Sequence, residues 1–254
     1  QQERFYLAVL HAPSKTCVWV ANRAAPLTDR AAQVQLTARG LSAEDQNGTA
    51  IWSTPPFGEP VAALRLDDRG NLALLDARNA TLWQSFDRPT DTIVSSQRLP
   101  AGAFLASAAS DSDYSEGDYR LNVTANDAVL TWMGSMYWRL SNDASSTMDR
   151  GGTVAYMAVN GTGLYLLSAD GGVIIQVSLP AAELRILKLG YDGKLQISSF
   201  ASVNSSRTPM DGGFAAPSDG CALPLSCGAL GLCTPKGCTC PALFAASHDG
   251  GCTP

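Results

Sequence analysis

Short runs of apolar, β-prone residues recur along the chain and predict an all-β protein. Apolar residues at the helical spacing i, i+3, i+4, i+7 are scarce, whereas short apolar runs end at Gly, Pro, Asn or Asp. This pattern is typical of a sandwich, a barrel or a prism. The clearest runs are residues 5–10, 17–20, 62–66, 72–75, 184–189 and 195–198.

Three tryptophans mark an internal repeat. Trp19, Trp52 and Trp83 are 33 and 31 residues apart, and each follows an aliphatic residue and precedes a turn that contains proline. Gly-led hairpins precede the second and third, at residues 40–49 and 70–81. A period of this length indicates several copies of one β unit. We therefore expect the three indole rings to pack against one another in a common core.

Composition excludes several function classes. The 254 residues suit two or three domains, and 45% hydrophobic residues are enough for real cores. A net charge of −5 with 16% charged residues gives no basic surface, so nucleic acid is not a predicted partner. No apolar run approaches the roughly 18 to 20 residues of a membrane helix, and the chain shows no signal peptide. We expect a trimmed extracellular piece.

Sequons for N-glycosylation indicate the secretory pathway. With nine Asn and 41 Ser plus Thr, chance would give about one or two Asn-x-Ser/Thr triplets, and five are present. We expect glycans there, on exposed loops or strand edges. The five asparagines are Asn47, Asn79, Asn122, Asn160 and Asn204.

Six of the seven cysteines follow residue 220 and predict a disulfide framework. They are Cys221, Cys227, Cys233, Cys238, Cys240 and Cys252. Only Cys233 and Cys238 have a spacing that suits zinc, and only His248 lies nearby, so no metal site is predicted. A segment this short cannot bury enough core and needs cross-links, although spacing alone leaves fifteen pairings open. Cys17, in an apolar stretch, is interpreted as a buried free thiol, with an intermolecular disulfide as the alternative.

Longer motifs make the chain resemble a known family. Pro26 and Leu27 follow VWVANR at residues 18–23, and GNL at 70–72 precedes LWQSFDRPTDT at 82–92. Both stretches resemble signatures of the bulb-type mannose-lectin domain of plant S-domain receptor-like serine/threonine kinases. The stretch CGALGLC at 227–233 resembles the CGxxGxC of that family's epidermal-growth-factor-like (EGF-like) module. The resemblance spans nearly the whole chain and is weakest from about 100 to 180.

The resemblance implies an all-β fold of tandem bulb-lectin-like β-prism domains followed by a small disulfide-rich EGF-like module. Residues 1–100 would be the bulb-type lectin domain without its N-terminal strands, 101–216 a second lectin-like domain of S-locus glycoprotein type, and 217–254 the EGF-like module. The family's disulfide pattern, carried over, pairs Cys221 with Cys233, Cys227 with Cys238 and Cys240 with Cys252. One carboxylate before the first of these cysteines is too few for the calcium-binding variant, so we expect no calcium.

The family's sugar motif is degenerate in this chain. Active bulb lectins carry Gln-x-Asp-x-Asn-x-Val-x-Tyr on a strand, where period-two spacing puts the polar residues on one face that can grip mannose hydroxyls. In this chain, Asn71 is interpreted as a turn residue. Only the Asn position is kept here, and around Gly40 not even that residue remains. Losing these hydrogen-bond partners predicts no mannose binding. The five aligned positions, in motif order, are Asp67, Arg69, Asn71, Ala73 and Leu75.

Catalytic and cofactor alternatives have little support. His11 and His248 are far apart in sequence and are interpreted as exposed bystanders, and no phosphate-binding glycine loop occurs. The acidic run at residues 111–116 lacks the glycine and glutamate of a calcium loop and is interpreted as a solvated loop. We predict no catalytic residue, no metal and no cofactor in this chain.

The leading hypothesis is the extracellular ligand-recognition and dimerisation region of a plant cell-surface receptor-like kinase, on the outer face of the plasma membrane. The resemblance implies a membrane helix and a cytoplasmic kinase outside this chain. Its ligand would be a peptide, a lipid or a glycan, and its partner a second copy or a co-receptor. Alternatives are a secreted mannose-type lectin acting in defence and a soluble decoy without the kinase. Contacts are expected within residues 100–200, although Met133, Met136, Tyr137 and Trp138 are predicted to pack in a core.

Overall fold

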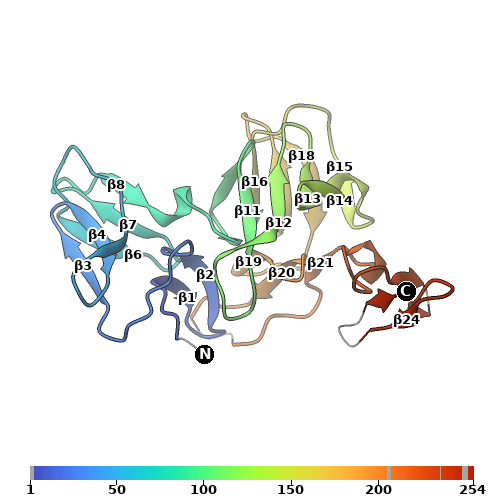
Figure 1. The fold of residues 1–254 in the computed structure, drawn as a ribbon. Coiled ribbons are helices and arrows are strands. Elements are labelled where there is room, and N and C mark those ends of the chain that lie inside the picture. Colours follow the sequence, from blue (N-terminus) through green and yellow to red (C-terminus); the bar gives the residue numbers. More distant parts are fainter. Residues whose placement is uncertain (1–2, 205–206, 235, 248–250) are drawn as a thin grey trace.

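The computed structural model describes residues 3–204, 207–234, 236–247 and 251–254, and they form three regions in a row (Figure 1). Blue and cyan strands make a first unit, green to tan strands a second unit, and the red C-terminal module lies at the far end. Within these described ranges no helix has the length and apolar character needed to cross a membrane. The helical elements are three single 3-10 turns, η1 (Ser85–Asp87), η2 (Leu140–Asn142) and η3 (Gly220–Ala222).

The first unit consists of three small antiparallel sheets. One pairs β1 (Ala8–His11) with β2 (Thr16–Val20). Another has the order β3 (Gln33–Thr37), β4 (Gly40–Glu44) and β5 (Ala50–Ser53). The third has the order β6 (Ala63–Leu66), β7 (Leu72–Leu75) and β8 (Thr81–Gln84).

The three repeat tryptophans meet in the core of the first unit, as the repeat predicts. Their ring centroids lie 6.0 Å apart for Trp19 and Trp52, 5.6 Å for Trp19 and Trp83, and 6.2 Å for Trp52 and Trp83. All three pairs are T-shaped, the geometry that aromatic quadrupoles favour. Each ring comes from a different sheet, so the triangle joins all three sheets.

The second unit also has three antiparallel sheets. The first has the order β21 (Phe214–Ala216), β20 (Leu195–Phe200), β19 (Leu184–Leu189), β9 (Thr92–Val94). The next has the order β10 (Arg98–Pro100), β16 (Tyr156–Asn160), β17 (Gly163–Leu167), β18 (Val173–Ser178), β15 (Ser146–Met148). The third has the order β11 (Phe104–Ala108), β12 (Glu116–Val123), β13 (Ala128–Trp132), β14 (Ser135–Arg139). Aliphatic side chains from all three sheets form its core.

The β9–β19–β20–β21 sheet serves both cores, because successive side chains of a strand point to opposite faces. On β9, Val94 packs in the first unit's core and Ile93 in the second unit's core. On β19, Ile186 and Leu187 divide in the same way. By strand pairing, residues 92–100 therefore belong with the second unit, whereas the predicted division at residue 100 assigns them to the first.

Two family motifs dock the first unit onto the second. Arg23 of the VWVANR stretch is buried and donates to backbone carbonyls of Tyr114 (2.5 Å), Ala106 (3.0 Å) and Ser107 (2.6 Å). Burial lowers the pKa of its guanidinium. Because three carbonyls of the second unit accept from this one side chain, the motif acts as an inter-unit clamp.

Asp91 of the PTDT stretch provides the second link. Its Oδ2 lies 2.7 Å from Lys188 Nζ on β19, and the Asp91 side chain is almost fully buried. The Thr92 hydroxyl also donates to Asp91 Oδ1 at 2.8 Å. Both carboxylate oxygens therefore have partners, as a buried charge requires.

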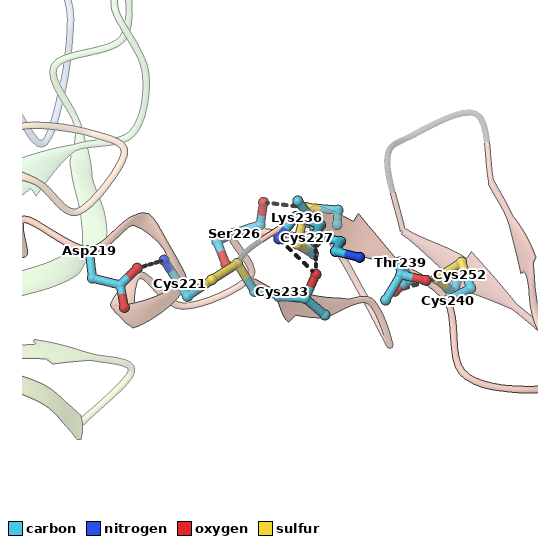
Figure 2. Close-up of a disulfide and its surroundings, with 12 residues drawn as sticks. Asp219, Cys221, Ser226, Cys227, Cys233, Lys236, Thr239, Cys240 and Cys252 are labelled. Atoms are coloured by element: carbon cyan, nitrogen blue, oxygen red, sulfur yellow. Dashed lines mark hydrogen bonds between the residues drawn. A yellow bond between two sulfur atoms is a disulfide. The ribbon is translucent and has the colours of Figure 1, made fainter.

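The C-terminal module is held by disulfides along its length (Figure 2). It has the three pairs that the resemblance implies, Cys221–Cys233, Cys227–Cys238 and Cys240–Cys252. Its strands are short, namely β22 (Leu232–Thr234), β23 (Gly237–Thr239), β24 (Ala245–Ala246) and β25 (Cys252–Thr253).

Both glycines of the CGALGLC stretch have structural reasons. Gly228 has a φ of 66°, in the left-handed region that favours glycine. A Cβ on Gly231 would overlap the carbonyl oxygen of Cys227. The motif is therefore a backbone requirement of the cross-linked turn.

Candidate ligand-binding site

Asn71, the one conserved position of the degenerate sugar motif, is bonded inside the protein. Its Nδ2 donates to Gln84 Oε1 at 2.8 Å, and its Oδ1 accepts from the Phe86 N–H at 3.3 Å and the Ser85 hydroxyl at 3.4 Å. Ser85 Oγ in turn accepts from the Leu72 N–H at 3.0 Å. The WQSFD stretch therefore engages both the donor and the acceptor that a sugar hydroxyl would need.

The five motif positions do not share one strand in this chain, and Asn71 lies in a turn, as predicted. Residues 67–71 form the turn between β6 and β7, because Asp67 Oδ1 accepts from the N–H groups of Arg69 and Asn71. Ala73 and Leu75 do lie on β7, facing away from the Trp core, yet they are only 1% and 4% exposed. The side chains of Ala73 and Leu75 are therefore closed to solvent.

The same turn occurs three times in the first unit. Asp45, Asp67 and Asp76 each accept from the N–H groups two and four residues later. The residue three positions after each Asp has a positive φ, which Gly supplies in the first two turns and Asn79 in the third. The Asp67 turn thus has a shared structural role in the repeat.

The largest opening near this turn is a groove of about 640 Å³ between the two units. The first unit contributes Asp68 and Arg69, the segment that links β9 to β10 contributes Ser96, and β10 contributes Arg98. The second unit supplies the remaining lining, chiefly Tyr156, Ala158, Asn160, Gly161, Tyr165 and Glu183. Sequence analysis missed this groove because its residues come from distant strands. The sequence does contain one indication of this groove. Tyr156 and Ala158 precede the sequon at Asn160 with period-two spacing, which places all three on one face of a strand.

Four of the five sequon asparagines are exposed, namely Asn47, Asn79, Asn160 and Asn204. Asn122 is different, because it is half-buried on β12, an inner strand of its sheet, and its Nδ2 donates to Thr131 Oγ1 at 3.1 Å. The expectation of a loop or strand edge is therefore wrong for Asn122. For Asn204, the Ser205 and Ser206 positions of its sequon lie outside the described residues.

The aromatic and methionine cluster divides between core and surface. Tyr137 packs against the second core and donates to the Gly193 carbonyl at 2.6 Å, and Trp138 packs against Phe214, as predicted. The core prediction is wrong for Met133 and Met136, which are 71% and 53% exposed. Both lie on the β13–β14 hairpin, and β14 is the edge strand of its sheet.

The histidines and the acidic run were the two candidate polar sites, and His11 and Asp113 both have structural partners. His11 is buried rather than exposed, with Nε2 2.9 Å from the Val203 carbonyl and Nδ1 2.7 Å from Ser14 Oγ. His248 lies outside the described residues. In the acidic run, Asp113 pairs with Arg4 and accepts from the Ser115 hydroxyl, so that residue is not simply solvated. Across the described part of the chain, no group of three His, Cys, Asp or Glu side chains could hold a metal ion.

Cys17 is a buried free thiol among the described residues, 6% exposed on β2. Burial raises the pKa of this thiol to about 11. It is therefore neutral and shielded at physiological pH, which disfavours the alternative of an intermolecular disulfide.

Comparison with protein families and relatives agrees with this geometry. Residues 16–104 match the family described as D-mannose binding lectin. A G-type lectin S-receptor-like serine/threonine-protein kinase of Arabidopsis thaliana is 38% identical over 93% of this chain, and the kinase SD2-5 of the same plant is 27% identical over 93%. The chain spans only 28% and 29% of the lengths of these two relatives.

A monomeric mannose-binding lectin of Gastrodia elata is similar in structure, at 15% identity and a TM-score of 0.35. The similarity covers 51% of this chain and 98% of that lectin. The homology to receptor kinases, together with the disulfides, indicates an extracellular location. The chain contains a bulb-type lectin domain and is a homologue of the extracellular part of the G-type lectin S-receptor-like serine/threonine kinases.

Proposed function

We propose that this chain is the ligand-recognition and dimerisation region of a plant cell-surface receptor-like kinase, glycosylated and displayed at the plasma membrane, where it acts in immune signalling. Its mechanism is binding, not chemistry. An extracellular ligand would bring two ectodomains together and so bring two kinase domains together.

The observation that carries this proposal is the bonding of Asn71. The lectin domain keeps its fold, but its remaining sugar-motif amide is engaged by Gln84 and Ser85. The Arg23 and Asp91 motifs are likewise used to dock the two units. A lectin scaffold without its mannose site supports recognition of another ligand.

Dimerisation is tested by analytical ultracentrifugation of the secreted chain, alone and with candidate peptides, lipids and glycans. We expect a monomer that becomes a dimer with one ligand class. The dimerisation proposal would be contradicted if the chain stayed monomeric with every candidate ligand while the full receptor still signalled in cells.

A second candidate is a secreted mannose-type lectin, and the match of residues 16–104 to D-mannose binding lectins favours it. This function would need a sugar site away from Asn71. Direct binding to a mannose glycan array, competed by free mannose, would support it. The length of the natural transcript separates the receptor from a soluble decoy form, because only the receptor continues into a membrane helix.

A further inference from the structure

The groove between the two units has an aromatic floor. On β16, Met157 and Val159 point into the core and are 0% and 1% exposed, so Tyr156, Ala158 and Asn160 point outward. Tyr165 on β17 lies directly opposite Ala158. Two phenol rings beside a methyl group offer a flat amphipathic surface of the kind that the C–H face of a pyranose can cover.

Polar groups of both signs surround this floor. The Arg98 guanidinium lies 4.5 Å over the Tyr156 ring, an arrangement that leaves its N–H groups free to donate sideways. Arg69 Nη1 donates to Ser96 Oγ at 3.0 Å. The carboxylates of Asp68 and Glu183 supply acceptors. Two cations and two anions favour a neutral ligand rich in hydroxyl groups over an anionic one.

The sequon at Asn160 is part of this groove. Asn160 Oδ1 accepts from the Thr162 N–H and hydroxyl, both at 2.8 Å, and from the Gly163 N–H at 3.2 Å. Thr162 Oγ1 also lies 2.7 Å from the Tyr165 hydroxyl. Asn160 and Thr162, the two sequon residues that N-glycosylation requires, are therefore linked by hydrogen bonds to Tyr165 of the aromatic floor.

The attachment atom itself is available and rigidly placed. No described residue accepts a hydrogen bond from Asn160 Nδ2, the atom to which an N-glycan attaches. The backbone carbonyl of Asn160 accepts from Nε of the fully buried Arg185 at 2.7 Å, and Arg185 also donates to the Gly161 carbonyl. A glycan here would start from a fixed point at the end of the groove.

We propose that the groove between the two units binds the chain's own N-glycan, attached at Asn160. The inner sugars of this glycan lie across Tyr156 and Ala158, and their hydroxyls bond to Arg98, Arg69 and Glu183. The glycan thereby bridges the two units from outside. The proposal requires that the chain passes through the secretory pathway, and it does not otherwise depend on the proposed receptor role.

Timed digestion of the native, secreted chain with an endoglycosidase tests the proposal, with site-resolved mass spectrometry as the readout. Asn47 is the internal reference, because it lies at the tip of a turn whose residues 46–50 are all exposed. We expect the Asn160 glycan to be released about tenfold more slowly than the Asn47 glycan, since sugars docked in the groove must detach from it before the enzyme can cleave the glycan. After denaturation, the two rates should be equal.

Arg98→Ala and Tyr156→Ala should each raise the Asn160 rate towards the Asn47 rate. Arg120→Ala is the matched control, because Arg120 lies 4.3 Å over the Phe104 ring on another sheet and should leave the Asn160 rate unchanged. The comparison of native with denatured wild-type protein stands even where a variant fails to fold. An unoccupied Asn160, or equal native rates at the two sites, would overturn the proposal. A groove that binds free saccharides equally in the glycosylated wild type and in Asn160→Gln would also overturn it, because the Asn160 glycan would then not occupy the groove.

Discussion

Asn71 donates a 2.8 Å hydrogen bond to the side-chain carbonyl of Gln84, and this bond joins the turn between β6 and β7 to the end of β8. The bond gives this residue of the sugar motif a structural role. Asn71 also accepts from the Phe86 N–H, so its amide organises the backbone of η1.

Asn71→Ala should therefore destabilise the fold. The variant loses its bond to Gln84 and leaves the Phe86 N–H without its partner, which should lower the free energy of unfolding by about 1–2 kcal/mol. Urea denaturation measures this change. Asn126→Ala is the control, because Asn126 is exposed, and it should change stability by less than about 0.5 kcal/mol. Equal stability of the two variants would show that the Asn71 network is dispensable.

Removing Arg23 should weaken the docking of the two units. Arg23→Ala removes three charge-assisted bonds to buried carbonyls and should lower the free energy of unfolding by about 3 kcal/mol. Arg23→Lys should recover little of this loss, because an ammonium cannot span the three carbonyls as the planar guanidinium does. Thermal unfolding of both variants, beside the exposed Arg39→Ala, measures the effect. Full recovery by lysine would contradict the clamp geometry.

Cys17 should resist alkylation in the folded chain. A pKa of about 11 leaves the buried thiol almost wholly neutral at about pH 8, and only the thiolate reacts. We expect no maleimide labelling of native protein and one label per chain after unfolding without reductant, since the other six cysteines are cross-linked. A covalent dimer on a non-reducing gel would contradict this account.

Asp113 should make the N-terminal segment sensitive to acid. The Ser115 hydroxyl, the Ser115 N–H and Arg4 hold the pKa of this carboxyl at about 2, below its ordinary 3.8. Because the folded pKa is depressed, its stabilising effect is present above about pH 4 and is lost as the pH falls towards 2. The amide hydrogen-exchange protection factors of residues 3–7, which correct for the intrinsic pH dependence of exchange, should fall across this window.

Asp113→Asn should show the same low amide protection in residues 3–7 already at neutral pH. Asp68→Asn, which removes an exposed carboxylate elsewhere, should behave as the wild type does. If the amide protection factors of residues 3–7 were the same at pH 5 and pH 2, Asp113 would not anchor the segment.

Features that depend on local spacing could be predicted from the sequence. The repeat of Trp19, Trp52 and Trp83 predicts a shared aromatic core, and the structure has it. The resemblance also implies the three disulfide pairs that the structure contains. The tryptophans could be predicted because their spacing repeats, whereas the disulfide pairs followed from the family resemblance, since spacing alone leaves fifteen pairings open.

Features that depend on partners distant in sequence could not be predicted. The acceptors of Arg23 are backbone carbonyls, which have no sequence signature. The role of the β9 strand depends on its pairing with β19, about ninety residues later in the sequence. The turn at residues 67–71 could be predicted, but the bonds of Asn71 to Gln84 and Phe86 could not, because these partners lie 13 and 15 residues later in the sequence.

The central claim, a lectin fold whose mannose site is lost, is tested most directly by a glycan array probed with the secreted chain after its own N-glycans are trimmed. Trimming removes self-glycans that could occupy or shield a site. The account predicts no mannose-competed signal, because Asn71 is bonded to Gln84 and the other four motif positions lack the required side chains. Clear binding that free mannose displaces, and that persists in the groove variant Arg98→Ala, would contradict it.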